Sequence, residues 1–220
     1  MLYLGLNPPK NNSNQTIIHY PVIQIQPKSP LDDCIKKIMN TLDSYTHIIF
    51  TSKTTVRLFM DYLIYYKRTN EDLRDKIIIS VGQATAKSLN NYEIKRDFVA
   101  KQEQAEGIVK ILENLSLKNA HILWPHSNKA RNLLKDYLEE KKVKYSEAVF
   151  YDTIFHHPKT QFSFDDIDSI FFTSPSTVDG FLAIFKKIPY NKKLICIGSV
   201  TQNHLDRICT NKNNMEQINV

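Results

Sequence analysis

The sequence predicts an α/β protein made of two doubly wound, parallel-sheet domains of similar topology. Two observations carry this prediction: short apolar runs alternate along the chain with amphipathic segments at helical spacing, and one such strand-and-helix unit occurs twice. Continuous apolar runs are typical of strands buried on both faces of a parallel sheet. With 220 residues, the chain is long for one domain and short for two of ordinary size.

The repeat can be read directly in the letters. Residues 48–59 read IIFTSKTTVRLF and residues 170–181 read IFFTSPSTVDGF, with seven of the twelve aligned positions identical. A second pair follows, in which residues 79–85 (ISVGQAT) match residues 195–201 (ICIGSVT) at the isoleucine, the glycine and the threonine. Two related α/β units are the simplest explanation of this repeat.

Each copy predicts a strand followed at once by a helix. Residues 48–50 and 170–172 are the strands, and the Thr-Ser pair after each strand supplies residues that favour a helix start. The glycine elements predict another strand and then a helix entered at Thr85 or Thr201. Because ligands of open parallel sheets bind at the carboxyl ends of the strands, we expect these helix N-termini to face a ligand.

The remaining elements complete two domains. Further strands are expected at residues 3–6, 22–25, 120–124 and 148–151, and helices at residues 32–43, 104–115, 128–140 and 202–209. Proline-containing linkers are expected at residues 27–30 and 155–164. They divide the chain into an inserted domain, residues 31–153, and a discontinuous domain, residues 1–26 plus 158–220.

Charge and composition narrow the classes of function. Lys and Arg exceed Asp and Glu by 29 to 23, and this net charge of +6 suits an anionic partner. The basic residues are scattered and no nucleic-acid-binding signature accompanies them, so we expect no nucleic acid as partner. The chain has five glycines and neither a G-x-G-x-x-G nor a Walker motif, which argues against dinucleotide and P-loop sites.

The cysteines and histidines predict no metal site. Cys34, Cys196 and Cys209 are an odd number with no C-x-x-C pair, which argues against a disulfide framework and a cysteine-based zinc site. The adjacent His156 and His157 would point in opposite directions on a strand. No segment approaches the ~20 apolar residues of a membrane helix, and no charged segment precedes the apolar start. We therefore expect a cytoplasmic protein without membrane segments.

Hydroxyl side chains gather where the predicted helices begin. A helix N-terminus offers unpaired N–H groups and a partial positive charge, which together bind anions. Two interpretations stay open for these hydroxyls: they help to bind an anion, or they only cap the helices. The residues are Thr51, Ser52, Thr54, Thr85, Thr173, Ser174, Ser176, Thr177 and Thr201.

An ordered series of motifs resembles the uroporphyrinogen-III synthase family. The series covers nearly the whole chain, from about residue 46 to residue 205, and its members are specific only as a set. It consists of I-F-T-S-x-x-x-V, V-G-x-x-T-A, Gln104-Ala105-Glu106, L-W-P-H-S-N-x-x-R, Phe150-Tyr151-Asp152-Thr153, F-T-S-P-S-x-V and I-G-x-x-T. The resemblance implies two α/β domains joined by a two-stranded linker, with a tetrapyrrole in the cleft between them.

The resemblance also implies a reaction. Its substrate would be hydroxymethylbilane, a linear tetrapyrrole with eight carboxylates, which loses its terminal hydroxyl as water and closes with inversion of the last pyrrole ring. Such a reaction needs no metal and no organic cofactor, since the pyrrole nitrogen itself expels the hydroxyl. Catalysis would then consist mainly of positioning, with one proton donor to the leaving oxygen.

Candidate residues follow from the matching motifs. Tyr151 matches a family tyrosine and is the expected catalytic proton donor, because a phenol is protonated at neutral pH; the alternative is that it only packs at a strand end. Arg131 either binds substrate or closes a structural ion pair. The residues expected to bind substrate carboxylates are Ser52, Thr85, Ser174, Ser176 and Thr201.

The N-terminus departs from the family pattern. Relatives start with a strand that ends in Arg-Pro and leads into a helix, whereas this chain reads Leu6-Asn7-Pro8-Pro9, and residues 8–14 are too short and too rich in Pro and Asn for that helix. The discontinuous domain is therefore expected to be reduced at its N-terminus, and the protein to be a monomer. Two other functions stay open: a non-catalytic two-lobed binding protein for a small polyanion, and nucleic-acid binding through the basic surface.

Overall fold

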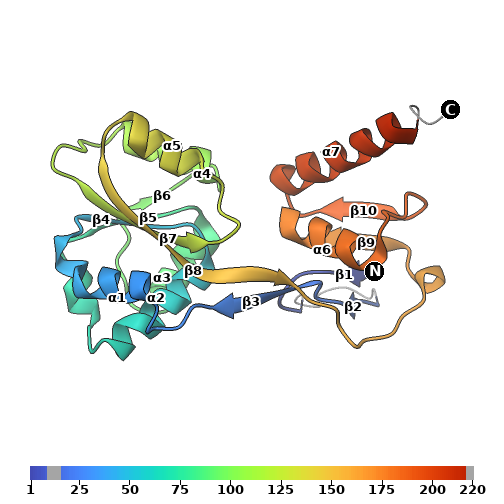
Figure 1. The fold of residues 1–220 in the computed structure, drawn as a ribbon, viewed down its shortest axis with the longest axis horizontal. Helices are drawn as coiled ribbons and strands as arrows, with labels where there is room; N and C mark the ends of the chain where they lie inside the picture. Colours follow the sequence, from blue (N-terminus) through green and yellow to red (C-terminus); the bar gives the residue numbers. More distant parts are fainter. Residues whose placement is uncertain (9–15, 217–220) are drawn as a thin grey trace. The chain divides into compact units, whose positions relative to one another are not determined.

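The structure, a computed structural model, describes residues 1–8 and 16–216. The chain forms two compact units: unit 1 comprises Met1–Ile25 and Thr153–Val220, and unit 2 comprises Gln26–Asp152. The sequence predicted that the inserted domain begins between residues 26 and 31 and ends between residues 153 and 158. Both predicted boundaries lie within a few residues of these divisions. Unit 2 is inserted in unit 1, so the chain passes from one unit to the other twice (Figure 1).

Unit 2 is built on a sheet with the strand order β3-β8-β7-β4-β5-β6. From β8 to β6 every neighbouring pair is parallel. The strands are β3 (Ile23–Pro27), β4 (His47–Phe50), β5 (Ile77–Ser80), β6 (Phe98–Val99), β7 (His121–Ser127) and β8 (Lys144–Phe155). The helices are α1 (Asp33–Asn40), α2 (Lys53–Tyr65), α3 (Gln83–Asn90), α4 (Ala105–Glu113) and α5 (Leu133–Glu140), with short 3₁₀ turns at Leu42–Ser44 and Asn70–Leu73.

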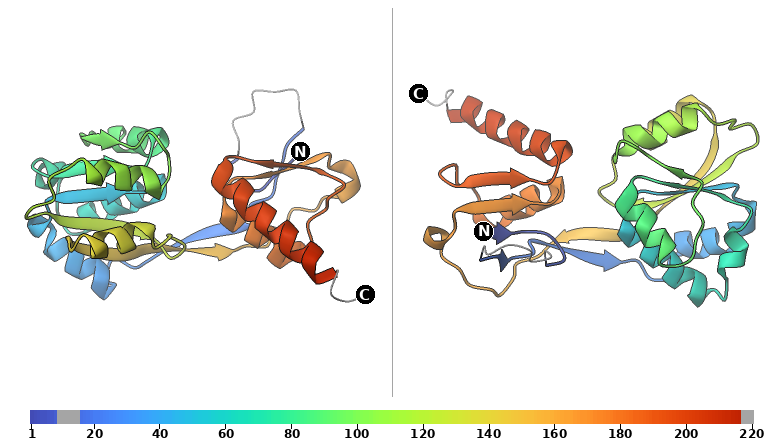
Figure 2. Two further views of the ribbon diagram at one scale, coloured as in Figure 1. Left: turned by 90° about the horizontal axis from the view of Figure 1, so that it is seen from above. Right: turned by 180° about the vertical axis from the view of Figure 1, so that it is seen from behind.

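Helices cover both faces of this sheet, as Figures 1 and 2 show. On one face, Ile49 and Trp124 belong to a buried cluster that also contains Ile108 of α4. On the other face, Phe59 of α2 packs edge-on against Phe50, with ring centroids 5.2 Å apart. The doubly wound arrangement predicted from the apolar runs is therefore present in unit 2.

The chain crosses between the units inside strands β3 and β8. These strands are neighbours in the sheet order. The amide of Lys28 donates to the carbonyl of Phe150 and that of His156 to Val22, each over 2.9 Å; residue numbers rise on one strand as they fall on the other, so the pair is antiparallel. The expected linkers at 27–30 and 155–164 are thus partly strand, because mutual hydrogen bonds satisfy the backbone of both segments.

Side chains of unit 2 hold its end of this strand pair. Lys28 Nζ lies 2.7 Å from Asp152 Oδ2, and this hydrogen bond raises the pKa of Lys28. The hydroxyl of Tyr62 donates to the carbonyl of Lys28 over 2.7 Å, and burial raises the pKa of Tyr62 to about 12. The strand pair is therefore anchored to α2 by a phenol that stays protonated.

Unit 1 has a parallel sheet in the order β10-β9-β1-β2. Its buried core joins Ile170 and Phe172 to Val178, Phe181 and Leu205, so both described helices pack on one face. The opposite face carries the stacked rings of Tyr3 and Phe171, which are partly exposed. The elements are β1 (Leu2–Tyr3), β2 (Ile18–His19), β9 (Ser169–Phe172), β10 (Lys193–Cys196), α6 (Pro175–Phe185), α7 (Ser199–Glu216) and a 3₁₀ turn at Phe164–Asp166.

Several elements differ from their expected bounds. β2 and β6 were not expected, since two residues are too few to form a pattern. α5 begins at Leu133 rather than at 128, and β8 runs over twelve residues rather than four. The segment 8–14, expected to lack the family's helix, falls outside the described residues except for Pro8. Within the described ranges, no helix is both long and apolar enough to cross a membrane.

Acidification is expected to destabilise unit 2 through His47. This side chain begins β4, is 5% exposed, and has a pKa lowered by burial. The unfolded chain therefore binds a proton at a higher pH than the folded chain, so the contribution of His47 to stability is present above its ordinary pKa and is lost as the pH falls. Urea unfolding at pH 7.5 and at pH 5.5 gives the free energy of unfolding at each pH. Between the two pH values, this free energy should fall less for His47→Gln than for the wild type. The matched control is His157→Gln, at an exposed position, whose free energy of unfolding should fall as much as that of the wild type. An equal fall in all three proteins would contradict the expectation.

Candidate functional site

In each unit, two helices begin side by side at one edge of the sheet. β4 and β5 are adjacent parallel strands, as are β9 and β10, so the helices that follow them start at the same edge. We call residues 51–55 and 173–177 the hydroxyl corners, and residues 81–85 and 197–201 the glycine corners. Equivalent bonds join each pair of corners: the amide of Val81 donates to Phe50 O and that of Ile197 to Phe172 O, both over 3.0 Å.

The two hydroxyl corners are near copies of one another. Ser52 and Ser174 are both extended N-cap residues, with φ/ψ of −159°/156° and −168°/163°. Their hydroxyls accept from the amides of Thr55 and Thr177, over 3.0 and 3.3 Å. Each serine therefore caps its helix, as one of the two interpretations predicted. A cap satisfies one of the four first-turn amides, which leaves amides of that turn for an anion.

In the glycine corners the threonine side chains are buried. Thr85 and Thr201 are the third residues of α3 and α7, and they are only 4% and 3% exposed. The helical bonds are again equivalent, with Ala86 N donating to Gly82 O over 2.9 Å and Gln202 N to Gly198 O over 3.0 Å. A carboxylate at either corner would therefore meet mainly the amides of the first turn.

Tyr151 lies at the hydroxyl corner of unit 2. Its hydroxyl is 3.2 Å from the hydroxyl of Ser52, and the residue is 7% exposed. A β-bulge places it there, since His126 pairs with Val149 but Ser127 pairs with Tyr151. The extra residue lets two successive side chains face the same helix: Phe150 contacts Phe59 of α2, and Tyr151 reaches the N-cap of α2. The bulge thus brings together two residues that the sequence singled out separately.

The hydrogen bonds of this corner leave a proton on Tyr151 available. The hydroxyl of Thr55 donates to the carbonyl of Ser52 over 3.1 Å. The hydroxyl proton of Ser52 then goes either to Thr55 Oγ1 or to Tyr151 Oη, both of which are within reach. When Ser52 donates to Tyr151, the phenol proton is free to be given to a third group. The arrangement can therefore act as a proton donor.

The other candidates are placed differently. Ser176, the second residue of α6, is half-buried, and its hydroxyl makes no hydrogen bond to any residue that the structure describes. Arg131 forms a two-pronged ion pair with Glu106, over 2.7 and 2.6 Å. This pair lowers the pKa of Glu106 and raises that of Arg131. For Arg131 the structure therefore shows the ion pair that the sequence left open as an alternative.

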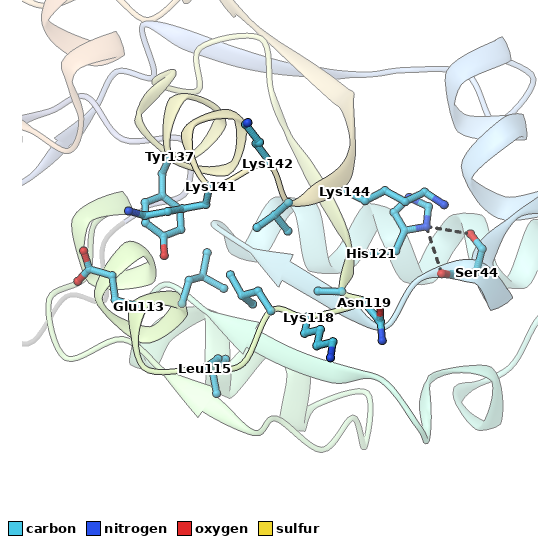
Figure 3. Close-up of a pocket in the computed structure, with 14 residues that line it drawn as sticks. Ser44, Glu113, Leu115, Lys118, Asn119, His121, Tyr137, Lys141, Lys142 and Lys144 are labelled. Carbon is cyan, nitrogen blue, oxygen red and sulfur yellow. Dashed lines mark hydrogen bonds between the residues drawn. The ribbon is translucent and has the colours of Figure 1, made fainter.

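A hollow of about 900 Å³ lies at the opposite edge of the unit 2 sheet, where β7 and β8 begin (Figure 3). Lys118, Lys141 and Lys144 line it. Its histidine, His121, is engaged by Ser44, over 3.1 Å to the carbonyl and 3.4 Å to the hydroxyl. α4 and α5 end at this edge, and cations are stabilised beside the carbonyl ends of helices. The lysines thus have a structural explanation away from the corners.

Two contributors were not singled out from the sequence. Thr55 matches Thr177 in the aligned repeat, so the identity at that position was the available signal. Glu103 is the other: its Oε1 accepts from the amide of Gln83, the first residue of α3, over 2.8 Å. No pattern in the sequence marks Glu103, because a loop brings it to the glycine corner only in the folded chain.

Comparison with known proteins identifies the family. A family model described as uroporphyrinogen-III synthase HemD matches residues 13–215. The porphyrin biosynthesis protein HemD of Ruminiclostridium josui is 26% identical over 190 residues, which are 84% of this chain and 38% of that protein. The chain therefore spans less than two fifths of the length of this curated relative.

Solved structures show the same fold. The uroporphyrinogen-III synthetase of Helicobacter pylori superposes with a TM-score of 0.63 at 18% identity, covering 94% of this chain and 87% of that one. A mutant uroporphyrinogen III synthase of Thermus thermophilus gives 0.64 at 13% identity, covering 87% and 79%. The resemblance predicted from the ordered motifs is confirmed by the family match over nearly the whole chain. The chain belongs to the uroporphyrinogen-III synthase family.

Proposed function

We propose that this chain converts hydroxymethylbilane into uroporphyrinogen III, with loss of water and inversion of the last pyrrole ring. Family membership supports the proposal. The observation that carries it is the repeated pair of corners: in each unit, two helix N-termini lie side by side at one sheet edge, and one of the corners holds a buried tyrosine. Such amide-rich ends suit a substrate with many carboxylates.

The reaction requires the protein mainly to position the substrate and to donate one proton. The nitrogen of the pyrrole that carries the hydroxymethyl group pushes its electron pair toward that carbon, the C–O bond breaks, and the protonated hydroxyl leaves as water. The substituted carbon of the last pyrrole then attacks the resulting azafulvene to form a spiro intermediate. Reopening and reclosure invert that ring, and a proton is lost. Holding the bilane in a folded conformation accounts for most of the acceleration.

We assign the proton donation to Tyr151. Its neighbour Ser52 can donate to it, which leaves the phenol proton for the leaving oxygen. The hydroxyl corner places this donor beside first-turn amides of α2, which would hold a nearby carboxylate of the substrate. We assign Ser176 and the glycine-corner amides near Thr85 and Thr201 to the remaining carboxylates.

We further propose that the enzyme works as a monomer in the cytoplasm. The free thiols of Cys34, Cys196 and Cys209 fit a reducing compartment. Analytical ultracentrifugation of the purified chain at micromolar concentration should give a single species of 25.6 kDa. A dimer that persists on dilution would contradict the monomer.

The reaction is tested by supplying freshly prepared hydroxymethylbilane to the purified chain. We expect the III isomer as the main product, because only an enzyme that folds the bilane inverts the last ring. Isomer analysis by liquid chromatography after oxidation to the porphyrins gives the result. Formation of the I isomer alone, as in buffer, would reject the proposal. Thermal stabilisation by a porphyrinogen without turnover would then favour the non-catalytic binding protein.

Tyr151→Phe is expected to lower kcat about a hundredfold, since general acid catalysis typically contributes 10²–10⁴. Product affinity should change far less, because the ring remains in place. The matched control is Tyr145→Phe, at the other end of β8. The hydroxyl of Tyr145 donates to Glu139 of α5. Steady-state kinetics and product titration separate the two effects. Wild-type turnover by Tyr151→Phe would remove this residue from the mechanism.

Ser174 and Ser176, two residues apart at the start of α6, should behave differently. Ser174→Ala removes the N-cap of α6 and should lower the free energy of unfolding by about 1 kcal/mol. Ser176→Ala should leave stability unchanged, because its hydroxyl has no protein partner among the described residues, but should weaken product binding severalfold. Urea unfolding and product titration of both variants give the comparison. Equal product binding by Ser176→Ala and wild type would contradict its assignment.

A further inference from the structure

The glycine corner of unit 2 already holds a carboxylate, that of Glu103. Its Oε1 accepts from the Gln83 amide over 2.8 Å, at the N-terminus of α3. Gly82 makes this approach possible: a Cβ on Gly82 would lie 2.6 Å from the carboxyl carbon of Glu103. The chain itself thus shows which kind of group this corner accommodates, a carboxylate at the first-turn amides.

The loop that carries Glu103 is held at its base, while the side chain is exposed. The amide of Ala100 donates to the carbonyl of Ser80 over 2.9 Å, which ties the start of the loop to β5. On the other side, the carbonyl of Gln102 packs against Gly107 so closely that a Cβ there would lie 2.0 Å away. Glu103 therefore has a fixed backbone near the corner and a side chain that can leave it by rotation.

The equivalent corner of unit 1 is built differently. Gly198 occupies the place of Gly82 in the repeat, but a Cβ on Gly198 would meet no atom within 4 Å. Gly198 is exposed, whereas Gly82 is buried. The two corners share two equivalent backbone hydrogen bonds, and in unit 2 the carboxylate of Glu103 lies against the corner.

We propose that Glu103 determines substrate specificity at the unit 2 corner, by occupying the place of a substrate carboxylate until a polycarboxylate displaces it. The inference rests on the proposed function. A tethered carboxylate competes at an effective concentration in the millimolar range. A small monocarboxylate cannot overcome this competition at ordinary concentrations, whereas a ligand already held through other carboxylates can. Glu103 thereby selects ligands with several acid groups.

The test compares the full-length wild type with Glu103→Gln, which keeps the size of the side chain and removes its charge. Product affinity of the variant should rise about twofold to fivefold, the usual effect of a charge at a helix N-terminus. The amide resonance of Gln83 should shift on titration with millimolar propionate in the variant and stay unchanged in the wild type. Without ligand, the variant should unfold at a slightly lower temperature, because the N-terminus of α3 has lost the negative charge beside it.

Two further variants separate local competition from general charge repulsion. Glu103→Asp keeps the charge but shortens the side chain, so it should also release the Gln83 amide and raise product affinity. Glu113→Gln removes the same charge at the end of α4, beside the hollow at the opposite edge, and should behave like the wild type. Equal gains in Glu113→Gln and Glu103→Gln would overturn the proposal, as would unchanged product affinity and propionate response in Glu103→Gln.

The outcomes also distinguish this inference from the proposed function. The wild type could form no III isomer while propionate shifts the Gln83 amide resonance only in the Glu103 variants. That result would support competition by Glu103 at the corner and reject the proposed reaction. If the wild type forms the III isomer and all variants have the same product affinity and propionate response, the proposed reaction is supported and the role of Glu103 is rejected.

Discussion

The parallel pairing of β4 with β5 and of β9 with β10 is the constraint on which the candidate site depends. Parallel strands end at the same edge, and in each unit one backbone bond, from Val81 to Phe50 or from Ile197 to Phe172, closes that edge with the same geometry. Two helices must then start next to each other, because each strand leads into its helix within two or three residues. The anion binding that we propose for the corners would thus follow from topology rather than from a special set of charged side chains.

This origin changes the meaning of the positive net charge. The excess of basic residues suggested an anionic ligand, but in unit 2 a group of lysines gathers beside the carbonyl ends of α4 and α5, at the edge away from the corners. Arg131, the arginine expected near the substrate, is engaged by Glu106. Apart from the exposed Lys53, the corners themselves consist of backbone amides and uncharged side chains. We propose that such a site would bind substrate carboxylates through directed hydrogen bonds, which impose geometry on a flexible chain more strictly than mobile lysines would.

Strand β8 combines two tasks along its twelve residues. One end pairs with β3 where the chain passes between the units, and Lys28, Asp152 and Tyr62 hold this pair from within unit 2. Its bulge opposite Ser127 turns Tyr151 toward Ser52 while Phe150 stays in the core. A tyrosine fixed by both a packed neighbour and a capped helix has little freedom to move. The same irregularity that interrupts the ladder therefore orients the expected proton donor.

The sequence by itself determined the repeat, the alternation of strands and helices, the helix starts at the Thr-Ser pairs, and the family, because each of these is written in local patterns of apolar and hydroxyl residues. It also held the signal for Thr55, which aligns with Thr177. Only the tertiary structure decided that Arg131 meets Glu106, that β8 carries a bulge, and that Glu103 covers the glycine corner of unit 2. Those contacts join residues from separate segments, so they arise from how strands align and loops fold back, which no local pattern encodes.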